Sequence, residues 1–236
     1  MAVLAIGGLA YFSLTAPAYA CSIQWVAQAT PSPQASATPR LGYVQEDMGR
    51  SHVPAGTKVK YLYCPPASGN HYAEPQGPLQ PRVYGPNEKA VPEGWVHNLE
   101  HGGLVLVYNC SSTTGGDGCS DAAQAAMKQL YSSWPLSPVC KLQPGVEGPV
   151  MARFDDMAYP YAALLWDEVL PLQTLDKQQI LAFFDQQAER TAPEQQCAPP
   201  SAGPSAAPSA TPSPSPSPTQ APASAAPSSS PAPAAS

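Results

Sequence analysis

The chain has few charged side chains, and the shortage is greatest at its two ends. Asp, Glu, Lys and Arg make up 12% of the 236 residues, against roughly 25% in typical soluble domains. Residues 1–39 and 201–236 contain none of them. The 11 basic residues form no cluster, and the net charge is −6. Because nucleic-acid binding rests on neutralising phosphates, we predict that the protein has no nucleic-acid partner.

Two of the charge-free segments are also biased in composition. Residues 201–236 are almost wholly Pro, Ser and Ala, and residues 29–39 (ATPSPQASATP) have the same bias. Such segments lack the apolar side chains that would offset the entropy lost on ordering them. We therefore expect a linker at 29–39, one globular domain at 40–199 and a disordered tail at 200–236.

The N-terminal segment is apolar rather than polar. It reads AVLAIGGLAYFSLTAPAYA and ends in Ala18-Tyr19-Ala20, a small-x-small cleavage pattern, directly before Cys21. This predicts a signal peptide or membrane anchor over 1–28, and hence an extracytoplasmic protein that is secreted or anchored to the membrane. Lipidation of Cys21 is a third alternative. No second long apolar run occurs, so we expect membrane contact only through this segment.

The six cysteines include no C-x-x-C pair, which argues against a four-cysteine zinc site. Cys110 and Cys119 flank a short polar loop, and Cys140 and Cys197 could join the C-terminal end to the body of the domain. We expect these two disulfides, in keeping with an oxidising compartment. With Cys21 set aside, Cys64 is then expected to be an unpaired thiol.

Hydrophobic patterns in the middle of the chain predict a short series of strands and helices. Residues 58–63 alternate polar and apolar side chains, and 104–108 (LVLVY) form a continuous aliphatic run, which indicates a central strand. Further strands are expected at 149–154 and 161–166, and helices at about 120–134 and 174–190. The order predicts an α+β single-domain sandwich, with a mostly antiparallel sheet and two helices. The Pro- and Gly-rich segment 64–99 is expected to be a long ordered loop.

All four histidines, His52, His71, His97 and His101, fall in one region of the sequence. Imidazole is a common ligand for Zn, Cu, Fe and Ni, and Glu100 adds a carboxylate beside them. We therefore predict that His71, His97, His101 and Glu100 bind a transition metal, with Zn or Cu as candidates. His52, at the start of the domain, is expected to brace the backbone or to be exposed.

The spacing of His97 and His101 sets a condition on that prediction. They are four residues apart, so they share a face only if the segment is helical. On an extended strand they would lie about 13 Å apart, too far to share one ion. Because Gly102-Gly103 and a strand follow at once, we expect a turn or coil here.

Two alternatives remain open at this point. His97, Glu100 and His101 spell H-x-x-E-H, a zinc-hydrolase motif in which Glu is the general base, although that motif belongs on a long helix. The first alternative is therefore a metal-dependent hydrolase that uses Glu100. The second is a cell-envelope binding module without a metal, in which the histidines are structural braces and Trp95 or Tyr84 is exposed.

Two segments, HVPAGTKVKYLYCPPASGNHY and VHNLEHGGLVLVY, resemble a family of bacterial exported domains catalogued only as a domain of unknown function. The family pattern has a His near its start, then P-P-T-S-G-x-H-Y, and then V-H-N-L-E-H-G before an aliphatic strand. His52, His71, His97, Glu100 and His101 fall on matching positions. The resemblance covers roughly 50–195 and departs at Ala67, where Thr is usual, and at Cys64, where Asn is usual. Cys64 would add a soft ligand and favour copper or zinc. The resemblance implies no activity, so whether the protein is an enzyme stays open.

Overall fold

The computed structural model describes residues 19–28 and 40–197. Residues 1–18, the whole predicted linker (29–39) and residues 198–236, which include the predicted tail, lie outside the described residues. The described elements in chain order are β1 (Ala20–Gln24), β2 (Tyr43–Val44), β3 (His52–Val53), β4 (Lys60–Cys64), β5 (His71–Tyr72), α2 (Pro92–Glu100), β6 (Val105–Tyr108), the 3₁₀ turn η1 (Ser112–Thr114), α3 (Asp121–Ser132), β7 (Val150–Arg153), β8 (Tyr161–Leu165), β9 (Glu168–Leu172) and α4 (Lys177–Gln187).

A five-stranded sheet in the order β2-β9-β8-β6-β7 forms the centre of the domain. All of its pairings are antiparallel except that of β6 with β7. The predicted α+β class with a mostly antiparallel sheet is therefore confirmed. The strands expected at 149–154 and 161–166 both form, but they flank β6 on either side instead of pairing with each other.

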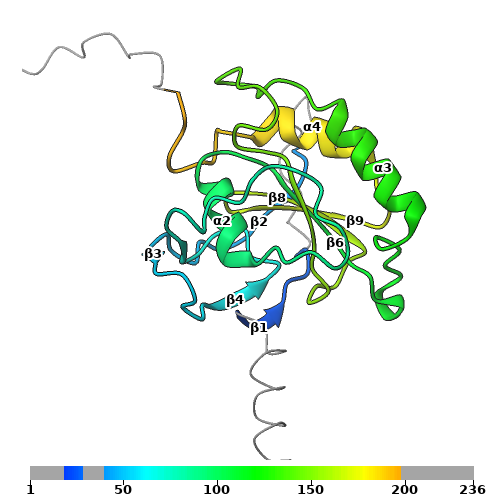
Figure 1. Cartoon of the computed structure of the whole chain (residues 1–236), viewed down its shortest axis with the longest axis horizontal. Helices are drawn as coiled ribbons and strands as arrows, with labels where there is room; N and C mark the ends of the chain where they lie inside the picture. The colour runs from blue at the N-terminus through cyan, green and yellow to red at the C-terminus, as the bar shows by residue number, and fades with distance from the viewer. Residues whose placement is uncertain (1–18, 29–39, 198–236) are drawn as a thin grey trace, which may run out of the picture. The chain divides into compact units, whose positions relative to one another are not determined.

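Both faces of this sheet are covered, which explains the aliphatic run of β6. Every residue of β6 is buried. Val105 and Val107 face a core that contains Trp95 and Leu99 of α2. The alternate residues face a second core, built with α3 and α4, which lie side by side on the opposite face (Figure 1). A strand that is buried on both faces has no polar side to display.

Helix α2 is the helix that the sequence analysis missed; the strands β1, β2, β3, β5 and β9 were not predicted either. It lies inside the segment 64–99, which was expected to be a loop, and it ends just before His101. Its start has the usual signals, with Pro92 at the first turn and the acidic Glu93 next to it. All nine of its residues are buried, including the polar Glu93, His97, Asn98 and Glu100, so its polar residues do not mark a solvent-facing side that would identify the helix.

The N-terminal described segment belongs to the fold. Strand β1 pairs in parallel with β4, and a disulfide joins Cys21 to Cys64. The prediction that Cys64 is an unpaired thiol, and with it a soft metal ligand, is therefore wrong. The same bond occupies the Cys21 sulfur that lipidation would require. The predicted pairs Cys110–Cys119 and Cys140–Cys197 are confirmed, and no free cysteine remains among the described residues.

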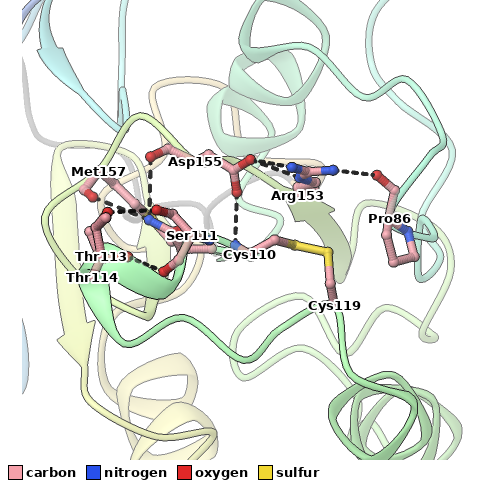
Figure 2. A network of polar contacts seen from close by, with 10 residues as sticks. Pro86, Cys110, Ser111, Thr113, Thr114, Cys119, Arg153, Asp155 and Met157 are labelled. Carbon is pink, nitrogen blue, oxygen red and sulfur yellow. Dashed lines mark hydrogen bonds and ion pairs between the residues drawn. A yellow bond between two sulfur atoms is a disulfide. The ribbon is translucent and has the colours of Figure 1, made fainter.

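The Cys110–Cys119 loop is fixed to the end of the sheet by Asp155 (Figure 2). One carboxylate oxygen of Asp155 accepts a hydrogen bond from the Cys110 amide at 2.8 Å, and the other accepts one from Nε of Arg153 at 2.9 Å. Arg153 also donates to the Pro86 carbonyl at 3.2 Å. This network therefore holds the segment before α2 and the disulfide loop to the same sheet edge.

The disulfide pattern predicts that denatured, unreduced protein has no titratable thiol among its six cysteines. Replacing Cys21 and Cys64 together by Ala should lower the free energy of unfolding by about 4 kcal/mol, because the bond closes a 43-residue separation. The matched variant, Cys110→Ala with Cys119→Ala, removes a bond that closes only 9 residues. Its free energy of unfolding should fall by about 2.5 kcal/mol. Urea unfolding measures both, and one or more free thiols in the intact protein would contradict the pairing.

Candidate metal centre

A short strand pairing brings two distant histidines together. Strands β3 and β5 pair in parallel, with His52 opposite His71. The pairing is fixed by backbone and side-chain contacts on either side, in which the His71 amide donates to the Ser51 carbonyl at 3.1 Å and the Ser51 amide donates to Oδ1 of Asn70 at 3.1 Å. Because the two residues are direct partners, their rings lie with centroids 4.7 Å apart.

Helix α2 supplies the other two side chains of the group. His97 and Glu100 are three residues apart on the helix and so lie on one face, which packs against β5. Asn98 fixes the helix to the preceding chain, since its side chain accepts from the Leu79 amide at 2.9 Å and donates to the Leu79 carbonyl at 2.8 Å. A loop and a helix are thereby locked in register beside the histidines.

The His71 ring lies between a backbone carbonyl and a buried carboxylate. Its Nδ1 lies 2.8 Å from the Gly69 carbonyl oxygen, which can only accept, so Nδ1 carries a proton. Its Nε2 lies 2.9 Å from Oε2 of Glu100, and both side chains are almost wholly buried. Two acceptors at that distance require something positive between them, either a shared proton or a cation. With a cation, His71 would have the arrangement of a typical metal ligand, in which the other ring nitrogen donates to a backbone carbonyl.

His97 is prepared in the same way. Its Nδ1 donates to the Tyr72 carbonyl at 2.7 Å, which leaves Nε2 with a lone pair in the neutral ring. Burial lowers the pKa of His97 to about 4, an effect that the hydrogen bond to Tyr72 opposes and the neighbouring His71 increases. The neutral imidazole is the form that binds metals. Gly77 packs so closely that an added Cβ would lie 3.0 Å from Nδ1 of His97.

Three imidazoles and one carboxylate therefore converge. The rings of His52, His71 and His97 lie 4.7–5.0 Å apart, and Nε2 of His52 is 3.4 Å from Oε2 of Glu100. One ligand atom from each of these four residues lies within 4.8 Å of the others, so the group could hold a metal ion. The ligand atoms of a tetrahedral zinc ion are about 3.4 Å apart. On binding, the longer distances within the group would therefore shorten, and the 2.9 Å contact between His71 and Glu100 would lengthen.

His101 lies outside this group. Its ring stacks on that of His97 at 4.9 Å, and its Nδ1 lies 2.8 Å from Nε2 of Gln196. It belongs to a second group, with Glu100 and Glu194. The segment is helical, contrary to the expected coil, but the two histidines of H-x-x-E-H fall in different groups. The geometry thus departs from the hydrolase motif, in which both histidines hold one zinc ion.

Of the four predicted ligands, the structure brings His71, His97 and Glu100 together and places His52 in the position expected for His101. His52 matches the first His of the family pattern but was expected to brace the backbone, because the two-residue strands that position it leave no pattern in the sequence. The backbone acceptors Gly69 and Tyr72 were also not predicted. The Tyr72 hydroxyl donates to the Thr57 carbonyl at 3.3 Å.

The low pKa of His97 predicts a dependence of stability on pH. The unfolded chain takes up this proton near pH 6.5 but the folded protein only near pH 4, so stability present above pH 6.5 is lost as pH falls towards 4. In metal-free protein the loss due to His97 should reach about 3 kcal/mol. Urea unfolding at pH 7.5 and 4.5 should show a smaller difference for His97→Gln than for the wild type. Equal differences would contradict the neutral, buried state.

One of three comparisons with known proteins identifies a family, and none supplies an activity. A search of curated proteins and a search of solved structures gave no match. A family model described as "Protein of unknown function (DUF3105)" matches residues 52–201, a span that begins at His52 and contains the whole histidine group. Since this match covers more than half of the chain, the protein belongs to the DUF3105 family of proteins of unknown function.

Proposed function

We propose that the domain binds one transition-metal ion through His52, His71, His97 and Glu100, outside the cytoplasm. The observation that carries the proposal is the pair of backbone carbonyls, Gly69 and Tyr72, which fix the Nδ1 protons of two buried imidazoles. Their Nε2 atoms are then the ring nitrogens left for a ligand bond, and that of His71 already lies 2.9 Å from Oε2 of Glu100. A structural brace needs no such convergence of three rings on one carboxylate.

The donor set favours Zn²⁺. Three imidazole nitrogens and one carboxylate oxygen complete a tetrahedral shell, and Cys64 is not available as a soft ligand that would select Cu⁺. Cu²⁺ accepts the same donors and competes by intrinsic affinity. His52 is 43% exposed, whereas His71 and Glu100 are buried, so an ion would enter and exchange from the side of His52.

The binding-module alternative has less support. It required an exposed aromatic patch at Trp95 or Tyr84, and both side chains are buried, at 0% and 6% exposure. That expectation is wrong. The hydrolase alternative keeps Glu100 as its base, but Glu100 already contacts two histidines of the group, which favours a ligand or orienting role over a base that faces substrate.

Elemental analysis of the full chain tests the proposal. Untagged protein from an oxidising compartment should contain at least one zinc or copper ion per chain. His71→Gln should lower that content by one ion per chain, and Glu100→Gln should lower it at least tenfold. The matched control is Glu93→Gln, since Glu93 is equally buried on the same helix and outside the group. Folded wild-type protein that contains no metal and takes up no added Zn²⁺ or Cu²⁺ would refute metal binding.

The disulfides fit an extracytoplasmic environment, and contacts at the start of β1 bear on how the N-terminal segment is processed. The Tyr19 ring packs on Phe154 with centroids 5.2 Å apart, and the Ala20 amide donates to the Val59 carbonyl at 2.9 Å. Cleavage after Ala20 would remove both contacts. Among the described residues, no helix has the length and hydropathy to cross a membrane.

The exported protein is accordingly expected to keep Tyr19. Mass spectrometry of the N-terminal peptide, after expression in a bacterium, should find a first residue at or before Tyr19. If the mature chain instead began at Cys21, the contacts of Tyr19 and Ala20 would be dispensable and this account of processing would be wrong. Tyr19→Ala, which removes the packing on Phe154, is the variant that should increase cleavage after Ala20.

A further inference from the structure

Glu100 belongs to two groups of candidate ligands at once. On one side are His52, His71 and His97; on the other are His101 and Glu194, each offering an atom within 4.8 Å of the rest of its group. We propose that a second cation binds between Glu100, His101 and Glu194, and that Glu100 bridges two metal ions. This inference rests on the proposed function of the first group.

The second group is held in place by the far end of the described chain. The Glu194 amide donates to the Glu100 carbonyl at 3.1 Å, and the Gln196 side chain contacts Nδ1 of His101 at 2.8 Å. The next residue, Cys197, forms a disulfide with Cys140. Three constraints thus fix this segment against the end of α2, where the helix dipole is negative and favours a cation.

Two glutamates share a cavity with His101, and each has one carboxylate oxygen without a hydrogen-bond partner, although the other oxygen of Glu189 accepts from the Val139 and Cys140 amides. A cavity beside α2 is lined by His101, Glu147 and Glu189, together with apolar side chains such as Trp134. Oε2 of Glu147 and Oε1 of Glu189 are buried without a hydrogen-bond partner. Within residues 19–28 and 40–197, neither glutamate nor Glu194 forms an ion pair with Lys or Arg. Buried carboxylate oxygens without partners are costly, and a nearby cation offsets that cost.

The helix geometry gives each ion its own imidazole. His97 and His101 are one turn apart, and their rings stack at 4.9 Å with an interplanar angle of 30°. Because Glu100 belongs to both groups, each of its oxygens could serve one position, as in two-metal centres whose ions lie about 3.5–4 Å apart. Oε2 of Glu100 already faces His71 and His52. With one imidazole and carboxylates, the second position suits Zn²⁺ or Mn²⁺ better than Cu⁺.

Equilibrium dialysis of the full chain against Zn²⁺, followed by elemental analysis, tests the inference. The wild type should bind two ions, His101→Ala with Glu194→Gln one ion, and Glu100→Gln none. Glu74→Gln, at an exposed glutamate outside both groups, is the control and should bind two. A cooperative urea unfolding transition establishes that each variant is folded.

The possible failures are distinguishable. One ion in the wild type, lost in His71→Gln but kept in the double variant, would overturn the second site and leave the first intact. Two ions that both persist in the double variant would show that the second ion lies elsewhere and would also overturn the inference. No ion in folded wild-type protein would overturn both proposals.

Discussion

The buried carboxylate of Glu100 is the constraint on which the site depends. A carboxylate that is 1% exposed needs partners, since burial without them costs several kcal/mol. Here His71 and His52 supply them, at 2.9 Å and 3.4 Å. The two elements that carry these histidines, β3 and β5, are only two residues long each. Their pairing and the docking of α2 on β5 are therefore coupled to the same polar contact.

Much of the fold follows from hydrophobic pattern. The aliphatic run of β6, the strands β7 and β8, and the helices α3 and α4 all have strong local periodicity and lie close to their predicted positions. Helix α2 could not be predicted in this way, because its polar residues are buried together with its apolar ones and do not mark a solvent-facing side. Strand β1 was also not predicted. Residues 19–28 continue an apolar, charge-free segment, and that composition indicates export rather than a strand of a sheet.

The site was only partly accessible from the sequence. His71, His97 and Glu100 could be proposed because they are the rare metal-binding types in one region, and the structure brings them together. His52 could not, since a two-residue parallel pairing carries no pattern. The partner of Cys64 was also beyond reach, because spacing alone cannot choose among cysteine pairings. His101 remains close to the group, one helical turn from His97, but faces other carboxylates.

Anomalous X-ray diffraction from crystals of the zinc-loaded full chain tests the central claim most directly. Data collected on both sides of the zinc absorption edge locate each ion without reference to activity. The account predicts an anomalous peak within about 2.2 Å of Nε2 of His71 and Nε2 of His97, with His52 and Glu100 completing the shell. A peak elsewhere, or a hydrogen bond between His71 and Glu100 that persists with no ion at saturating zinc, would contradict it.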